Sequence, residues 1–145
     1  RSTLFPYTTL FRSLRYGTIF CGMAERCEGA EKIDLTLYAE MLRRGLEDLS
    51  EIIEAKVGDK TIVDTLAPAV EAVERSVNQG EPIDRAMASM ISAAEQGKES
   101  TRDMVARVGR SSRLGERSKG VLDAGAVSCF LIIEAMGQGI QDLCL

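Results

Sequence analysis

The chain has 145 residues, a formal net charge of −4, 45% apolar residues and 28% charged residues. This length suits one domain with a hydrophobic core, and the longest apolar run, at 127–133, is too short to cross a membrane. The acidic body disfavours a nucleic-acid partner. The absence of histidine removes the commonest general base and every Ser-His or Cys-His nucleophile.

The four cysteines show no CxxC spacing, and no histidine is present to complete a zinc site with them. We therefore expect reduced thiols, buried inside a cytoplasmic protein. The four are Cys21, Cys27, Cys129 and Cys144.

The first thirteen residues, RSTLFPYTTLFRS, differ from the rest of the chain because they show no helical period. Residues 4–13 resemble the in-frame translation of a common sequencing-library adapter. We therefore predict that residues 1–13 are non-native and exclude them from the fold. Residues 14–145 are then expected to form the C-terminal part of one helical domain.

The remaining sequence has helical periodicity and no strand-like alternation. The predicted fold class is all-α, an antiparallel bundle or barrel of about five amphipathic helices. The last helix, which is apolar over its first three turns, is expected to be the most buried. The predicted helices are 16–30; 35–55, capped by Asp34; 58–79, kinked at Pro68 and ended by Gly80; from Pro82 past Gly97 toward Val105; and 124–140, capped by Asp123.

A glycine- and arginine-rich segment, GRSSRLGERS at 109–118, lies between the last two predicted helices. Residues 98–119 contain seven basic and three acidic groups, a local net charge of +4. Glycines allow close backbone approach, arginines offer forked donors, and a following helix start favours anions. The segment is either a solvated basic loop or a site for a small anion such as a nucleotide phosphate.

The motif Gly58-Asp59-Lys60-Thr61 lacks the upstream glycine and the preceding strand of a phosphate-binding loop. By itself it predicts a helix start that Asp59 or Thr61 caps. Alternatively, Asp59, Lys60 and the backbone N–H groups contact a bound nucleotide or order its loop. Asp64, one turn later, is expected to be a surface partner of Lys60.

Three segments together resemble the nucleotide-binding L subunit of dihydroxyacetone kinase, in the same order, over about residues 14–145. They are LRYGTIF (14–20), GDKTIVDTLAPAVEA (58–72) and KESTRDMVARVGRSSRLGERSKGVLDAGAVS (98–128). The resemblance implies a barrel of antiparallel helices that binds ADP or ATP at one end. It also implies phosphoryl transfer to dihydroxyacetone held on a histidine of a separate K subunit. In some members a phosphotransferase-system protein is the phosphoryl donor.

The resemblance also implies which residues form the nucleotide site. Arg110 and Arg117 would neutralise phosphate charge, and Ile62 would make an apolar contact. Ala124 stands where the family has proline, and Ile53 stands where it has a contacting glycine. The implied site comprises Gly58, Asp59, Lys60, Thr61, Ile62, Arg110, Arg117, Asp123, Ala124 and Gly125.

The family's magnesium ligands, a cluster of aspartates followed by histidine, and its Gly-Gly-Ala-Ser-Gly loop have no counterpart in this sequence. Mg²⁺ is therefore expected only in the intact parent protein. We assign no metal ligand and no catalytic residue here, and we expect the chain alone to be inactive. Two other interpretations are a fatty-acid-kinase-like nucleotide-binding domain and a non-catalytic helical module whose arginine loop docks an acidic partner.

Overall fold

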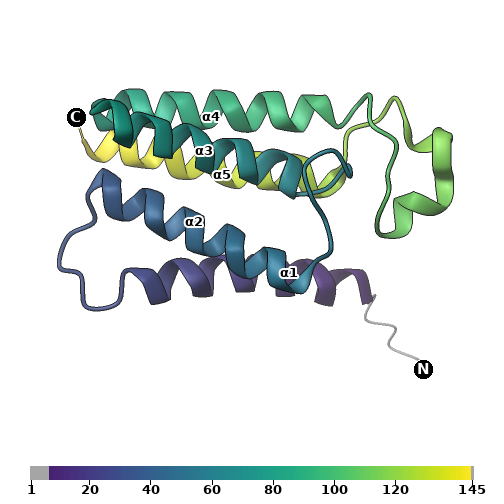
Figure 1. Ribbon diagram of the computed structural model, residues 1–145, viewed down its shortest axis with the longest axis horizontal. Helices are drawn as coiled ribbons and strands as arrows, with labels where there is room; N and C mark the ends of the chain where they lie inside the picture. The colour runs from purple at the N-terminus through teal and green to yellow at the C-terminus, as the bar shows by residue number, and fades with distance from the viewer. Residues whose placement is uncertain (1–6, 145) are drawn as a thin grey trace. The chain divides into compact units, whose positions relative to one another are not determined.

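The computed structural model describes residues 7–144, without the side chains of residues 7–13 and Arg110 (Figure 1). This part contains five α-helices and one 3-10 segment, and it contains no strand. The predicted all-α helical fold is confirmed. The chain divides into two compact units, Arg1–Ile53 and Glu54–Leu145, which are described separately below.

The first unit is a hairpin of α1 (Tyr7–Arg26) and α2 (Leu35–Ile52). The Asp34 carboxylate accepts a hydrogen bond of 2.8 Å from the Leu37 N–H, which confirms the predicted cap. Gly45 of α2 faces α1, and a Cβ added there would lie 2.8 Å from the Ile19 carbonyl oxygen. The two helices therefore approach as closely as they do because residue 45 has no side chain.

The boundaries of these two helices differ from the prediction. The expected start at Tyr16 is wrong, because α1 already begins at Tyr7. The segment between these tyrosines contains no glycine or proline, so a helix can propagate through it. α2 ends before Ile53, which has extended backbone angles. Residues 1–6 lie outside the described part, and the non-native origin of residues 1–13 stays a prediction.

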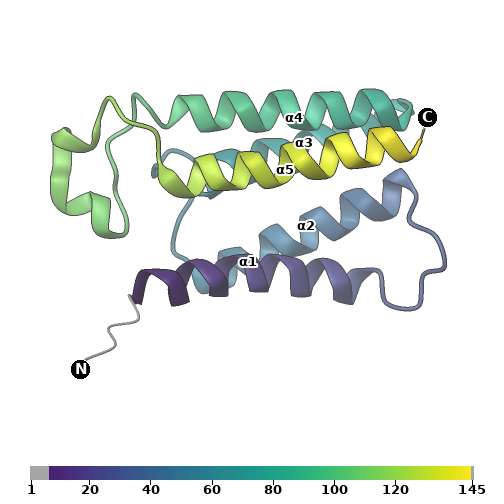
Figure 2. The ribbon, with the colours of Figure 1, turned by 180° about the vertical axis from the view of Figure 1, so that it is seen from behind.

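The second unit packs α3 (Val63–Gln79), α4 (Ile83–Ser100) and α5 (Ala124–Leu143) side by side (Figures 1 and 2). Ten of the 17 residues of α3 are buried, against five of the 20 residues of α5. The expectation that the last helix is the most buried is therefore wrong. Apolar composition raised that expectation, but part of the apolar surface of α5, including Leu131, is exposed to solvent.

α3 is one continuous helix through Pro68, and Gly80 ends it in the left-handed conformation as predicted. Proline has no N–H, so the Asp64 carbonyl, four residues earlier, loses its helical donor. Gly97 of α4 lies directly against that carbonyl, so closely that an added Cβ would clash with it. The Asp64 carbonyl of α3, which lacks its helical donor, thus lies against Gly97 of α4, which lacks a side chain.

α4 ends at Ser100, so the predicted continuation toward Val105 is wrong. The chain turns away there because its backbone bonds elsewhere. The Gly120 N–H donates to the Arg102 carbonyl at 2.7 Å, and the Arg107 N–H donates to the Asp59 carbonyl at 3.3 Å. These bonds hold the two flanks of the 101–123 segment together and tie it to the turn that precedes α3.

Among the described helices, α5 is the one whose length and composition would suffice to cross a membrane. Core helices of soluble proteins meet the same criteria. Because α5 packs on α3 and α4, this feature is weak evidence, and we assign no membrane segment.

Candidate functional site

The beginnings of α3 and α5 lie next to each other. A Cβ added to Gly125 would be 3.6 Å from the backbone nitrogen of Ile62. One turn into α3, the Thr65 hydroxyl donates to the Ala126 carbonyl at 3.2 Å. The segments 58–62 and 123–125, both assigned to the site from the sequence, are thus brought together. Helix N-termini carry partial positive charge and N–H groups without intrahelical acceptors, so this end suits an anion.

Asp64 holds the turn that precedes α3. Its buried carboxylate accepts hydrogen bonds from the Gly58 N–H at 2.6 Å and from the Thr61 N–H at 2.7 Å. Gly58 has a φ of 99°, a conformation that favours glycine. The expectation that Asp64 is a surface partner of Lys60 is wrong, because this carboxylate is turned inward to backbone donors.

Thr61 and Asp59 have different roles at this turn. The Thr61 hydroxyl accepts a hydrogen bond of 3.2 Å from the Val63 N–H, so Thr61 caps the start of α3. The Asp59 carboxylate instead accepts from the Lys56 N–H at 3.0 Å and lies 3.8 Å from the Arg107 guanidinium. Asp59 is buried and braces its own loop; it does not cap the helix.

Lys60 connects this turn to the segment after α4. The residue is 3% exposed, and its ammonium donates to three backbone carbonyls. The acceptors belong to Met104 at 3.2 Å, Ser118 at 2.5 Å and Val121 at 2.7 Å. An ammonium has three protons, and all three are matched here. Of the two roles considered from the sequence, nucleotide contact or loop ordering, this geometry fits loop ordering.

Two hydroxyl residues that the sequence did not single out complete these connections. The Ser118 hydroxyl accepts from the Ala106 N–H at 2.9 Å and donates to the Gly115 carbonyl at 2.7 Å. The Thr101 hydroxyl accepts from the Asp123 N–H at 3.0 Å. Both side chains are buried. Their burial identifies them as structural residues, but burial of a single hydroxyl cannot be read from the sequence. The helical period of the sequence instead assigned Thr101 to the continuation of the preceding helix.

α5 starts as predicted. The Asp123 carboxylate accepts from the Ala126 N–H at 2.8 Å, which confirms the cap. A Cβ at Gly125 would come within 2.8 Å of the same carboxylate, so this turn is tight. Ala124, the first residue of the helix, is exposed to solvent.

The arginine-rich segment forms η1 (Arg110–Ser118), two 3-10 turns interrupted at Gly115. It projects beyond the helix ends of the second unit (Figures 1 and 2). Arg117 is exposed, and no hydrogen bond or ion pair joins its side chain to the described residues. The side chain of Arg110 lies outside the described part, so its nucleotide contact stays a prediction.

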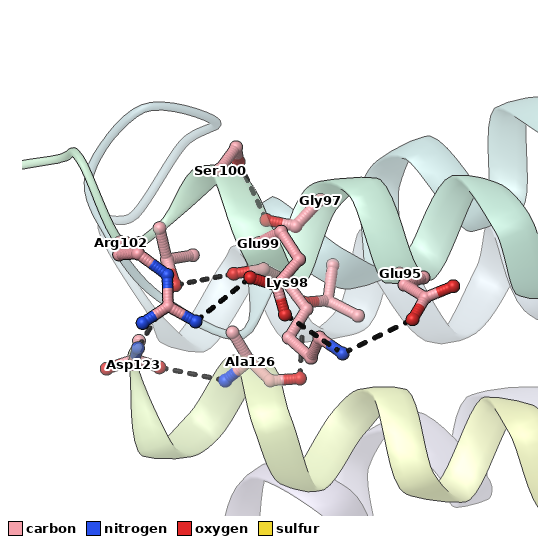
Figure 3. Close-up of polar contacts among 10 residues, drawn as sticks. Glu95, Gly97, Lys98, Glu99, Ser100, Arg102, Asp123 and Ala126 are labelled. Carbon is pink, nitrogen blue, oxygen red and sulfur yellow. Dashed lines mark hydrogen bonds and ion pairs between the residues drawn. The ribbon is translucent and has the colours of Figure 1, made fainter. Parts of the chain in front are cut away.

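Figure 3 shows a charge cluster where α4 ends near the start of α5. The Lys98 ammonium lies 3.8 Å from Glu95 and 3.3 Å from Glu99, and 4.1 Å from the centre of the Phe130 ring. Arg102 pairs with Glu99 at 3.1 Å. The hydrogen bond from Arg102, followed by that from Lys98, lowers the pKa of Glu99. Glu95 and Glu99 therefore balance the charges of Lys98 and Arg102. In the arginine-rich segment, by contrast, Arg117 has no acidic partner among the described residues.

The described residues contain no group of three His, Cys, Asp or Glu side chains that could hold a metal. The described residues therefore do not fit a magnesium site, and we assign no step to the ion.

The burial of the thiols also differs from expectation. Cys129 alone is buried, and burial raises its pKa to about 12. Cys21 and Cys144 are exposed and Cys27 is half-buried, so burial of all four was wrong.

A helical unit with two adjacent helix beginnings and a projecting basic loop belongs to the class of helical domains suited to anion binding. The sequence matches the DAK2 domain over residues 15–138, so the chain belongs to the DAK2 domain family. The family resemblance stated above is confirmed.

Among curated relatives, the chain is 34% identical over 127 residues to the PEP-dependent dihydroxyacetone kinase, ADP-binding subunit DhaL, of Escherichia coli K12. The match covers 88% of this chain and 60% of that protein. The corresponding subunit of kinase 1 of Listeria innocua is 32% identical over 123 residues, or 85% of this chain and 56% of its own.

An L-erythrulose kinase of Pectobacterium atrosepticum is 34% identical over 98 residues. That match covers 68% of this chain and 17% of the kinase. The chain therefore spans less than two thirds of the length of each of these curated relatives.

Proposed function

We propose that the second unit binds the phosphates of ADP or ATP at the end where α3 and α5 begin. The proposal rests above all on the 3.6 Å approach between Ile62 and a Cβ added to Gly125, which puts both helix beginnings at one place. Two helix N-termini that face one region give more positive potential than either one alone.

Within this site we assign phosphate contacts to the backbone of residues 60, 62, 124 and 125, because the N–H groups of Gly58 and Thr61 already donate to the Asp64 carboxylate. Arg117, which is exposed and without an ion-pair partner in the described part, would supply charge to the phosphates, together with Arg110. Ile62 would lie beside the apolar part of the nucleotide. Lys60, whose protons are all matched by carbonyls, and Asp59, which braces the loop, would act on the ligand only through the backbone they order.

The chain would then be the ADP- or ATP-binding component of a cytoplasmic kinase that phosphorylates dihydroxyacetone or a related short ketose. The relatives support this assignment, because they are named as ADP-binding subunits of dihydroxyacetone kinase and as an erythrulose kinase. A separate K subunit would hold the ketose, and a phosphotransferase-system protein is a candidate phosphoryl donor. The residues of this chain would bind and orient the nucleotide.

Isothermal titration of the chain with ADP, with and without Mg²⁺, tests the proposal. Arg117→Ala should weaken ADP binding by about tenfold, since a charge-assisted contact to phosphate contributes roughly 1.4 kcal/mol or more. Arg75→Ala is the matched control, because Arg75 is also exposed but lies twelve residues after the start of α3. A folded chain that binds no ADP, or equal losses in the two variants, would contradict the assignment.

A further inference from the structure

We propose that Lys60 is a positioning residue that fixes the arginine-rich segment to the start of α3. This inference deepens the proposed function and rests on it for the link to nucleotide. The observation behind it is that one buried ammonium gathers three carbonyl oxygens from both sides of that segment, Met104 before it and Ser118 and Val121 at and after its end.

The backbone conformation of Lys60 is unfavourable for a residue with a side chain. Lys60 has a φ of 61°, and within the described part it is the non-glycine residue with a positive φ. A lysine there is less favourable than a glycine because its Cβ crowds the following carbonyl. The strained backbone directs the side chain into the carbonyl cage, so the ammonium contacts offset the strain.

Besides Lys60, Arg107 also ties the chain before this segment to the turn that precedes α3, through its N–H to the Asp59 carbonyl at 3.3 Å and its guanidinium 3.8 Å from the Asp59 carboxylate. Gly109, Gly115 and Gly120 have positive φ angles and open space around them. The Ser118 hydroxyl bonds to Gly115 within the segment and to Ala106 just before it, and not to the turn that precedes α3. Lys60 joins the segment to the helix beginnings through three hydrogen bonds from a charged donor, which are stronger than neutral ones. Arg107 holds only the chain before the segment, whereas Lys60 holds it on both sides, so the position of the arginines relative to the helix beginnings depends chiefly on the Lys60 side chain.

The test is Lys60→Gly, because glycine accepts the backbone angle without strain and removes only the side chain and its ammonium. Hydrogen exchange of the amides at 104–121, measured without nucleotide, should accelerate about tenfold or more. ADP affinity, measured by titration calorimetry, should fall by about tenfold, since a displaced loop no longer presents its charges. Lys32→Gly is the matched control, because Lys32 is exposed in the loop between α1 and α2 and should change neither quantity.

Chemical rescue separates the ammonium from a general loss of packing. n-Butylammonium can occupy the vacated space and donate to the three carbonyls, so it should restore slow exchange and ADP binding in Lys60→Gly. Tetramethylammonium at the same concentration has no N–H donor and should restore neither. Unchanged exchange in Lys60→Gly, or equal rescue by both cations, would overturn the inference.

Two further outcomes are also decisive. If the wild-type chain binds no ADP, the proposed function fails, while the exchange and rescue measurements still judge the tie made by Lys60. If Lys60→Gly does not fold, nitrogen-15 NMR of the wild-type chain decides. The Lys60 ammonium, assigned through its own side-chain carbons, should exchange its protons slowly with water, and fast exchange would overturn the inference.

Discussion

Gly97→Ala should destabilise the second unit, because the backbone of α4 at this residue lies against the Asp64 carbonyl of α3. An added Cβ would lie 3.0 Å from the Pro68 Cγ and 3.1 Å from the Asp64 carbonyl carbon, and it would clash with the carbonyl oxygen itself. Since ordinary contacts begin at 3.4 Å, the helices would have to separate by 0.4 Å to relieve the contact with the proline, and by more to relieve the clash with the carbonyl oxygen. Overpacking of this kind costs about 1–3 kcal/mol, and a clash with backbone lies at the upper end.

The expected net loss is smaller than the packing cost, because alanine is intrinsically better than glycine in a helix by about 1 kcal/mol. We expect the free energy of unfolding, measured by urea titration with circular dichroism, to fall by about 2 kcal/mol. Gly139→Ala in α5 is the control, since nothing lies within 4 Å of an added Cβ there. That variant should gain about 0.5–1 kcal/mol from helix propensity alone. Equal stability of the two variants would refute the close contact between α3 and α4.

Two other predictions concern buried polar groups. Since burial raises the pKa of Cys129 to about 12 from 9.0, its thiolate fraction at pH 8 is roughly 10⁻⁴, against about 0.1 for an ordinary thiol. A thiol reagent should therefore modify Cys144 rapidly and Cys129 only on unfolding, and similar rates would contradict its burial. Asp64→Asn should lower the free energy of unfolding by about 2 kcal/mol, because the amide cannot accept from both backbone N–H groups. Asp142→Asn, at an exposed position, should change it little; an equal loss there would count against this role of Asp64.

The features that the sequence predicted correctly depend on neighbouring residues. Asp34 and Asp123 each accept from an N–H three residues later, and Gly80 adopts the left-handed angle that ends a helix. Such contacts depend on residue type at short spacing, so the sequence alone identifies them. The same holds for the helical stripe of α4, where Met87 and Met90 are buried as predicted.

The features that the sequence missed depend on distant parts of the chain. The ammonium of Lys60 finds acceptors that belong to the backbone, and a backbone carbonyl has no signature in the sequence. Asp64 was misassigned because spacing suggested a lysine partner, whereas tertiary folding supplied two N–H donors. The end of α4 was predicted too late because the apolar helical period continues through Val105. In the structure, tertiary hydrogen bonds of the following segment turn the chain away after Ser100.

The sequence separations of the Lys60 contacts have a consequence for the order of folding. They are 44, 58 and 61 residues. Bringing together such distant groups costs loop-closure entropy, which falls steeply once α3 and α4 have already paired. We therefore expect the three carbonyls to close around the ammonium late in folding and to release it early in unfolding. A nucleotide bound at the beginnings of α3 and α5, beside these contacts, would chiefly slow unfolding and would leave the rate of folding nearly unchanged.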